Sequence, residues 1–357
     1  MFHHLLITRF GIGVRTPSWY EYKLSLFEAI TLPSICSQRR EGLFWLIVID
    51  SRIPSESLLA LQAIVEAHSF IHLVSIDVYN QPRMIHGGFA WVYEQCQNYL
   101  LAEGLIEDPT AYVITSLIDD DDAWNRDTVR IVDKHIEENA HRLFIAELDA
   151  RRGFLVRHTS GMFITFEKGI IWNTQKKLYH EVLQPSFSMS VFVFARFSSN
   201  ISACTVRHRA WAAYLASVDF EQHILQTSAP MWVYFRHPKA LCEHEWAESG
   251  IQVDDRELMD FERLFSIDGD AYVRFFNSFI SKMPAHPGVP DDDKFELLDL
   301  QFRIGAVRQQ ILCLTERLED CASAPKARKK IEEIQRSAIK KLESLRTRFD
   351  LIATSEK

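Results

Sequence analysis

Four consecutive carboxylates, Asp119 to Asp122, are the residues of this sequence with the clearest capacity for chemistry. They directly follow the apolar run 111–118, which has the composition of a strand buried on both faces. In an open α/β sheet, ligands bind beyond the carboxyl ends of the strands. Carboxylate oxygens at that place suit Mn²⁺ or Mg²⁺, which also bind phosphate oxygens. The position therefore predicts a divalent-cation site for a diphosphate group.

A solvated acidic turn that caps the next helix is the alternative reading of this tetrad, since aspartate is common at helix starts. One aspartate is enough for a cap, whereas this sequence supplies four in a row. We therefore favour the cation site, with the cation neutralising charge on a leaving nucleoside diphosphate.

The elements that must position the tetrad alternate between strand and helix up to about residue 140. Apolar runs predict strands at 3–8, 44–49, 71–78 and 111–118. Helical spacing predicts helices at 21–30, 54–68, 89–101 and 127–138, and Pro33 is expected to end the first helical region. Such alternation is typical of βαβ units, so we expect an α/β fold with a mostly parallel sheet flanked by helices.

The pattern changes after residue 140. Short strands are expected at 143–148, 153–157 and 161–166, and a last core strand at 231–235, whereas 187–197 fits no class. Apolar residues then recur at alternating steps of three and four over 297–318, and a second stripe covers 331–352. We expect three parts: a catalytic α/β domain at 1–250, a helical connection and linker at 251–287, and a helical hairpin or coiled-coil extension at 288–357. The extension is expected to make a homo-oligomer.

Three segments of the chain resemble the bacterial putative rhamnosyltransferase family: 26–35, 44–50 and 116–123, the last of which contains the tetrad. The resemblance continues more weakly through 147–154 and 231–237 and covers roughly residues 3 to 240. Leu117-Ile118 departs from the Arg-Leu that is frequent in the family, and Pro238 replaces a common Asn. The resemblance implies a GT-A-like fold and a nucleotide-sugar donor.

Matched to the D-x-D pattern of GT-A enzymes, the aspartates of the tetrad are expected to have different roles. Asp119 is expected at the ribose or a bridging water, and Asp121 at the metal with Asp122 as a second ligand or sugar contact. The register Asp120-x-Asp122 also fits, so Asp120 stays a donor-binding candidate. The resemblance makes His237 a third metal ligand or a phosphate contact, and neutral imidazole suits Mn²⁺.

Other candidates complete the predicted site. Asp50, at the end of a predicted strand, is expected near the nucleotide, and Arg9 and Arg83 are candidates for the diphosphate. A base must take the proton of the acceptor hydroxyl in an inverting transfer. Asp149 and Glu221 are the preferred candidates, and the sequence does not decide between them and two other carboxylates, Glu181 and Asp219.

Composition narrows the class of protein. The 357 residues are 47% hydrophobic and carry a formal net charge of −8, which gives no general attraction to nucleic acid. The six cysteines are scattered without a C-x-x-C pair, which argues against a disulfide framework and a cysteine zinc site. No apolar stretch reaches the roughly 18 to 20 residues of a bilayer span. We expect a cytoplasmic protein without a transmembrane segment, for which peripheral contact with the inner membrane stays open.

The sequence thus predicts a metal-dependent glycosyltransferase. By the family's name it moves rhamnose from a nucleoside-diphosphate donor to a carbohydrate acceptor in cell-surface polysaccharide synthesis. Two alternatives stay open. One is a Mg²⁺-dependent nucleotidyltransferase or phosphotransferase that uses the same aspartates. The other is a non-catalytic scaffold that acts through its helical tail.

Overall fold

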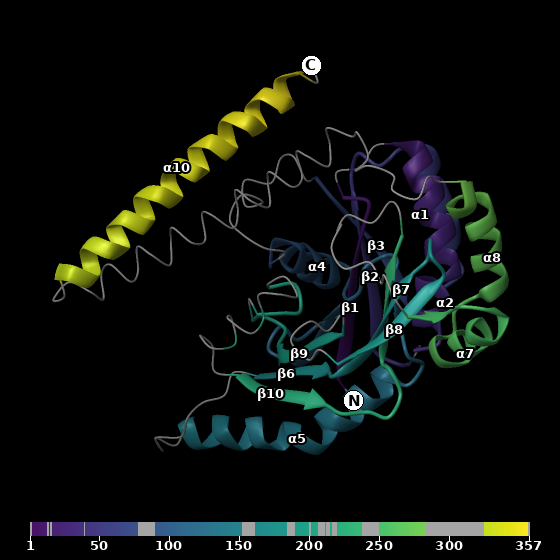
Figure 1. Cartoon of the computed structure of the whole chain (residues 1–357). Coiled ribbons are helices and arrows are strands. Elements are labelled where there is room, and N and C mark those ends of the chain that lie inside the picture. Colours follow the sequence, from purple (N-terminus) through teal and green to yellow (C-terminus); the bar gives the residue numbers. More distant parts are fainter. Residues whose placement is uncertain are drawn as a thin grey trace.

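The structure is a computed structural model, and the residues it describes form two β-sheets with helices around them (Figure 1). The described residues are 2–12, 14, 16–38, 40–77, 90–151, 161–183, 190–199, 201–205, 211, 215, 220–237, 250–282 and 325–355. Arg83, Asp219, the expected strand at 153–157 and the heptad stripe at 297–318 lie outside them.

The larger sheet, sheet A, has seven strands in the order β10-β6-β9-β4-β1-β2-β3. Strands β1, β2, β3 and β4 are all parallel to one another, and β10 is parallel to β6. Strand β9 lies antiparallel between β4 and β6, in the segment that the sequence pattern left unclassified. The bounds are β1 His3–Phe10, β2 Leu43–Asp50, β3 Ile71–Ile76, β4 Tyr112–Leu117, β6 Gly161–Phe166, β9 Val191–Arg196 and β10 Phe220–Leu225.

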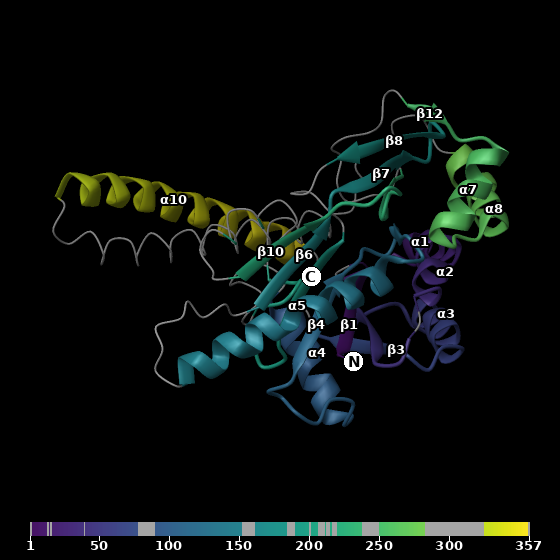
Figure 2. The ribbon, with the colours of Figure 1, turned by 90° about the horizontal axis from the view of Figure 1, so that it is seen from below.

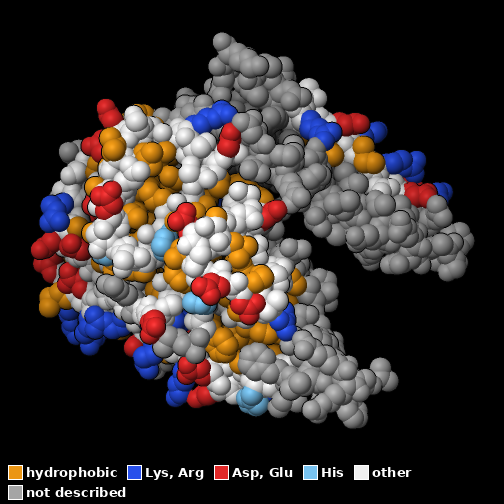
Figure 3. Space-filling model, turned by 180° about the vertical axis from the view of Figure 1, so that it is seen from behind, with side chains coloured by type: hydrophobic (Ala, Val, Ile, Leu, Met, Phe, Trp, Pro, Cys, Tyr) orange, Lys and Arg blue, Asp and Glu red, His pale blue; other side chains and the backbone are white. Residues whose placement is uncertain are grey.

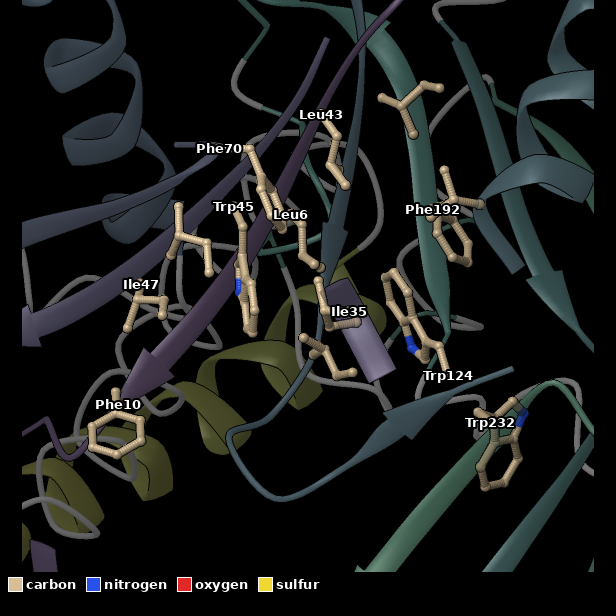
Figure 4. Close-up of a cluster of buried hydrophobic side chains, with 14 of the residues drawn as sticks. Leu6, Phe10, Ile35, Leu43, Trp45, Ile47, Phe70, Trp124, Phe192 and Trp232 are labelled. Atoms are coloured by element: carbon tan, nitrogen blue, oxygen red, sulfur yellow. The ribbon is translucent and has the colours of Figure 1, made fainter. Parts of the chain in front are cut away.

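The central strands β1, β2 and β4 of sheet A are apolar on both faces because each face is covered. Leu6 of β1 and Ile47 of β2 point into one core cluster, whereas Leu5 and Val48 point into another on the opposite face. Figure 4 shows part of the first cluster, in which Trp45, Ile35 and Trp124 lie between the sheet and its neighbours. This double burial explains why the parallel strands read as continuous apolar runs.

The helices next to sheet A mostly have the predicted positions. They are α1 Pro17–Ala29, α2 Thr31–Cys36, α3 Ser55–Glu66, α4 Ala90–Ala102 and α5 Thr128–Arg151. The expectation that Pro33 ends the first helical region is wrong, because Pro33 lies inside α2. It is the third residue of that helix, where a backbone N–H would have no intrahelical acceptor, so proline is tolerated.

The strand expected at 143–148 is also wrong, because helix α5 continues through it to Arg151. Val132, Ile136, Ala140 and Leu143 form the buried stripe of this helix against the first core cluster. A short apolar run fits a helix or a strand equally well, and here the helical spacing of the preceding residues continues.

A smaller sheet B has the order β12-β8-β7-β11-β5. Its strands are β5 Ala123–Trp124, β7 Lys168–Asn173, β8 Leu178–Leu183, β11 Trp232–Arg236 and β12 Ile251–Gln252. Strand β5 pairs with β11 and comes directly after the aspartate tetrad. Sheet B therefore joins the tetrad to the chain around residue 235.

Helices α7 Asp255–Phe265 and α8 Gly269–Ser278 and the short 3₁₀ helix η4 Ile280–Lys282 follow β12. Phe261 and Phe275 are buried in one cluster with Tyr22 of α1 and Trp172 of β7. Figure 2 shows α7 and α8 beside α1 and α2. The segment expected to be a connection and linker over 251–287 thus contributes, up to residue 282, to the core of the α/β domain.

Helix α10, Pro325–Ser355, is drawn apart from the sheets in Figure 1. Its helical state agrees with the second apolar stripe, and its pairing with 297–318 stays a prediction. Among the described residues, no helix is both long and apolar enough to cross a bilayer. The face in Figure 3 mixes acidic, basic and hydrophobic side chains. The predicted fold class, α/β with a mostly parallel sheet flanked by helices, is confirmed.

Candidate active site

The carboxyl ends of β1, β2 and β4 meet at one edge of sheet A, which we call the tetrad edge. In the parallel register Ile7 of β1 lies opposite Leu117 of β4, so the residues two positions further on also come together. There Arg9 Nη2 lies 3.1 Å from Asp119 Oδ1. Both side chains keep part of their surface in solvent, 21% for Arg9 and 27% for Asp119. This pair is therefore the accessible part of the tetrad edge.

A buried lysine, Lys23 of α1, holds the next two carboxylates. Its Nζ lies 2.7 Å from Asp120 Oδ1 and 2.6 Å from Asp121 Oδ2, and only 4% of its side chain is exposed. The ring of Trp19, one turn earlier in α1, lies 5.7 Å from the ammonium. A buried ammonium is costly unless it is paired, and here two carboxylates pair with it.

His237, directly after β11, contacts Asp121 as well. His237 Nε2 lies 2.8 Å from Asp121 Oδ2, and His237 Nδ1 lies 2.9 Å from the hydroxyl of Tyr22. The imidazole is fully buried. The Tyr22 ring also packs on Phe275 and Phe279, with centroids 5.0 and 5.4 Å away. The region after residue 255 thus supports the tetrad edge through Tyr22.

Asp122 turns toward sheet B instead. Its Oδ1 accepts a hydrogen bond from the backbone N–H of Phe235 in β11 at 3.0 Å. Its Oδ2 is buried without a hydrogen-bond partner among the described residues. Burial, followed by the charges of Asp121 and Asp119, raises the pKa of Asp122 well above its ordinary value. We conclude that Asp122 fastens the tetrad to β11.

The pKa values of the two carboxylates that contact Lys23 are shifted in opposite directions. Burial raises the pKa of Asp120 to about 7; Lys23 counteracts this, and Asp121 and Asp119 add to it. For Asp121, burial is outweighed by Lys23 and by the hydrogen bond from His237, so its pKa lies below the ordinary value. Burial alone would lower the pKa of Lys23, but the two carboxylates raise it above the ordinary value. The Lys23–Asp121 pair is therefore ionised at neutral pH.

The protonation of His237 follows from its neighbours. Burial lowers the pKa of this imidazole, and the hydrogen bond to Asp121 only partly opposes that. An ionised carboxylate can only accept, so Nε2 of a neutral His237 carries the proton that it donates to Asp121. Nδ1 then accepts the hydrogen bond from the Tyr22 hydroxyl. The Asp121 contact thus selects one tautomer.

Asp50 ends β2 at the same edge and is fully buried. Its Oδ1 accepts the backbone N–H of Arg52 at 3.0 Å. Nearby, the Tyr20 hydroxyl donates to the carbonyl of Gly11 at 2.8 Å. Burial, then Asp50 and Asp120, raises the pKa of Tyr20. Gly11 has φ +59°, and a Cβ there would lie 2.5 Å from the Tyr20 hydroxyl oxygen. The loop after β1 therefore requires glycine to close against Tyr20.

Helix α2 fixes the backbone after the tetrad. Ser34 Oγ donates to the carbonyl of Trp124 and accepts its N–H, both at 2.9 Å. Gln38 Nε2 donates to the carbonyl of Asn125 at 2.7 Å, and Asn125 Nδ2 donates to that of Pro230 at 3.0 Å. The short strand β5 is thus held on both sides, which fixes the position of the backbone that follows the tetrad.

The structure does not bring Asp149 to the tetrad edge. Asp133 of α5 accepts a hydrogen bond at 2.9 Å from Arg40, whose guanidinium also donates to the carbonyl of Phe2, just before β1. Helix α5 has therefore reached the opposite edge of the sheet by Asp133. Asp149 lies about 24 Å further along the same helix. Its expected position after a strand is wrong, and this placement removes the reason to regard it as the base.

Glu221 is also distant from the tetrad edge. It lies near the amino end of β10, which runs in the direction of β4 with β6 and β9 between them. Its carboxylate lies 3.2 Å from His223 Nε2. Glu181 lies on β8 and pairs with Lys168 at 2.9 Å. The structure thus groups Arg9, Asp50, the tetrad and His237, and leaves Glu221 outside this group.

The donor set does not fit the divalent cation that we expected at Asp121, Asp122 and His237. Asp121 Oδ2 is taken by Lys23 and His237, the proton on His237 Nε2 removes its lone pair from coordination, and Asp122 Oδ1 accepts a backbone N–H. Within the described part of the chain, no three His, Cys, Asp or Glu side chains are arranged to hold one metal ion.

Two residues of this site, Lys23 and Tyr22, were missed from the sequence. One signal pointed to Lys23. It lies three and four positions from buried α1 residues on both sides, namely Trp19, Tyr20, Leu26 and Phe27. A lysine on the apolar stripe of a helix needs an anionic partner in the interior, and the tetrad was the obvious one.

Comparison with known proteins places this geometry in context. A family model described as "Putative rhamnosyl transferase" matches residues 14–240. A search of curated proteins gave no match. The chain is similar to the crystal structure of S. aureus TarS 1-349, with 9% identity, a TM-score of 0.36, and coverage of 94% of this chain and 92% of that one.

Two further solved structures are similar at the same level. The S. aureus TarS 1-349 complex with UDP has 10% identity, a TM-score of 0.38, and coverage of 98% and 92%. A structure titled as a putative glucose-1-phosphate thymidylyltransferase from Bacillus anthracis in complex with a sucrose has 9% identity, a TM-score of 0.33, and coverage of 65% and 89%. At these values the likeness carries no assignment of a ligand.

Proposed function

This chain belongs to the putative rhamnosyl transferase family, and on that premise we propose that it transfers a sugar from a nucleoside diphosphate to a hydroxyl group of a carbohydrate acceptor. Membership makes the chain a glycosyltransferase. It favours neither of the two alternatives, a nucleotidyltransferase or phosphotransferase and a scaffold. Rhamnose as the sugar and polysaccharide synthesis as the setting rest on the family's name.

The observation that supports this proposal is the grouping of Arg9, Asp50 and the tetrad at the carboxyl edge of parallel strands. Such an edge is where open α/β sheets bind ligands. Arg9 is a cation of this edge that contacts the tetrad and keeps a share of its surface in solvent, and its planar guanidinium suits phosphate oxygens. We assign the donor diphosphate to Arg9 and the ribose to the carboxylate of Asp119, with the buried Asp50 near the nucleotide.

The transfer has a simple balance. The acceptor oxygen forms a bond to the anomeric carbon, and the bond from that carbon to the diphosphate oxygen breaks. The bonding electrons leave with the nucleoside diphosphate, and the hydroxyl proton passes to a carboxylate or to water. Arg9 stabilises the charge that appears on the diphosphate, because a fixed cation in a partly buried site costs little reorganisation.

A ligand screen tests this proposal. UDP, dTDP, GDP, CDP and ADP are added separately to the purified chain, and the melting temperature is recorded. A ligand at about 100 times its Kd adds about 2.7 kcal/mol to stability, so the matching nucleotide is expected to raise the melting temperature by several degrees. The corresponding nucleotide sugars, dTDP-rhamnose among them, are then incubated with saccharide acceptors, and the released nucleoside diphosphate is measured.

The variant Arg9→Gln is expected to weaken nucleotide binding at least tenfold, whereas Arg130→Gln, in an exposed pair with Asp127, leaves it unchanged. Release of pyrophosphate from nucleoside triphosphates would point instead to a nucleotidyltransferase. Absence of binding and of transfer with every donor would overturn the proposal.

A further inference from the structure

A lysine lies where the sequence led us to expect a metal ion. Lys23 Nζ bridges Asp120 and Asp121 at 2.7 and 2.6 Å, and its side chain is 4% exposed. This contact is more buried than the Arg9–Asp119 pair. The ammonium therefore acts on the tetrad from the interior of the protein.

We infer that Lys23 supplies the positive charge that the tetrad would otherwise take from a divalent cation, so that the nucleoside diphosphate binds here without a metal ion. This inference rests on the proposed function. It assigns Lys23 as a positioning residue, because it touches Asp120 and Asp121 and acts on the donor through them.

The hydrogen bonds of the tetrad support this inference. Each aspartate has an oxygen committed to a protein donor: Asp119 to Arg9, Asp120 and Asp121 to Lys23, and Asp122 to the N–H of Phe235. A divalent ion bound through Asp120 and Asp121 would lie beside the ammonium that already holds one oxygen of each, and the two positive charges would repel unless the ammonium were displaced. A displaced Lys23 would lose both of its partners in the interior, which is unfavourable.

The chain itself supplies most of the positive charge at this edge, where two cations face three carboxylates. Three carboxylates, Asp119, Asp120 and Asp121, face the guanidinium of Arg9 and the ammonium of Lys23. Asp122 accepts its hydrogen bond from Phe235 of β11 instead and is close enough to the buried Arg236 to be influenced by its charge. A further divalent ion would leave this edge with an excess of positive charge before any nucleotide arrived.

The position and the tautomer of His237 also support the inference. His237 donates from Nε2 to the oxygen that Lys23 also contacts, and Tyr22 occupies Nδ1. Neither nitrogen has a lone pair directed at an open coordination position. Lys23 and His237 instead hold one oxygen of Asp121 between two donors.

The first test uses the unaltered chain. The nucleoside diphosphate that binds in the screen of UDP, dTDP, GDP, CDP and ADP is titrated by calorimetry, once in EDTA and once in 1 mM Mn²⁺. The expected Kd values agree within threefold. A Kd at least tenfold weaker in EDTA would overturn the inference and leave the proposed function intact. Lack of binding in both buffers would overturn both.

The second test uses Mn²⁺ alone and does not depend on activity. Lys23→Ala removes the internal cation and opens space beside two carboxylates, so Mn²⁺ is expected to raise the melting temperature of this variant. Lys134→Ala is the matched control, because Lys134 lies on α5 with a side chain 71% exposed. Mn²⁺ is expected to leave the control and the unaltered chain unchanged. A Mn²⁺-induced rise in the unaltered chain would contradict the inference.

Two more variants keep the test valid if Lys23→Ala does not fold. Lys23→Arg preserves the charge and is expected to keep the nucleotide Kd within tenfold. The fold-decrease in kcat is expected to be larger than the fold-change in KM. Lys23→Met combined with Asp120→Asn removes one charge of each sign and keeps the volume. If that double variant binds nucleotide as tightly as the unaltered chain, the ammonium has no role in donor binding and the inference fails.

Discussion

Lys23 and His237 donate to the same oxygen of Asp121, at 2.6 and 2.8 Å, although one belongs to an early helix and the other follows the last strand of the core. This shared acceptor joins α1 to β11. It also couples the ionisation of the site to its shape, because both donors need the carboxylate in one position. Four predictions follow from this geometry and its surroundings.

Asp121→Asn tests the shared acceptor. The change keeps the shape of the side chain but removes the charge that Lys23 and His237 share. We expect the transfer rate to fall about 100-fold or more, as for the loss of one preorganised electrostatic group. Asp133→Asn is the control, because Asp133 is also paired with an arginine but lies toward the opposite edge. Equal activity losses in both variants would argue against a specific role for Asp121.

Tyr22→Phe tests the support of His237. It removes the hydroxyl that lies 2.9 Å from His237 Nδ1 and keeps the aromatic packing on Phe275. We expect the free energy of unfolding to fall by about 1 kcal/mol and kcat to fall several-fold, with little change in the donor KM. Urea unfolding and initial rates measure the two effects.

Tyr272→Phe is the matched control for that change. Tyr272 is buried in the same cluster as Tyr22, but its hydroxyl has no hydrogen-bond partner among the described residues. Its removal should be neutral or slightly stabilising, since no bond is lost and no polar group stays buried. If both variants lose the same stability, the Tyr22–His237 contact contributes nothing measurable.

Gly11→Ala tests the closed loop at the tetrad edge. Gly11 and Gly104 both have left-handed backbones, with φ of +59° and +66°. An alanine at Gly104 meets nothing within 4 Å and should cost about 1 to 2 kcal/mol of backbone strain only. At Gly11 the new methyl group would collide with the Tyr20 ring. We expect a clearly larger loss of stability and a weaker affinity for nucleotide, measured by urea unfolding and calorimetry. Equal losses in the two variants would contradict this account.

The pH dependence of stability tests the buried His4, whose Nε2 lies 2.7 Å from Ser116 Oγ. Burial, with a smaller contribution from Arg40, lowers its pKa well below the ordinary value of 6.5. Below pH 6.5 the unfolded chain therefore binds a proton that the folded chain does not. The stability due to neutral His4 is complete above that pH and is lost as the pH falls toward the folded pKa.

His4→Gln should therefore flatten the fall of stability between pH 6.5 and 5. One proton corresponds to about 1.4 kcal/mol per pH unit at most. Urea unfolding at half-unit steps measures the slope for both chains. An unchanged slope in the variant would show that His4 is not held neutral by burial.

Much of the fold could be predicted from local pattern. The strands β1, β2 and β4 are buried on both faces, so each reads as an apolar run, and the helices around them show helical spacing. The tetrad could be recognised as a candidate site for the same reason, because four charged residues directly after a buried strand are more than a helix cap needs. The parallel order then brought Arg9 and Asp50 to the same edge without further information.

The errors arose where local pattern is ambiguous. Residues 143–148 are apolar enough for a strand, but helix α5, whose buried stripe includes Leu143, continues through them to Arg151. Asp149 was proposed as a catalytic base because it followed that incorrectly predicted strand. Glu221 was chosen from its residue type alone, and the position of β10 at the far end of the sheet decided against it.

The sequence by itself determined the α/β class and the place of the acidic edge, because both follow from the spacing of residues that are close along the chain. Only the tertiary structure decided what the acidic edge is paired with. Lys23, Tyr22 and His237 converge on Asp121 from segments that no periodicity connects. The physical reason is that a buried charge is stable only beside its partner, and the fold alone sets which partner lies within hydrogen-bond distance.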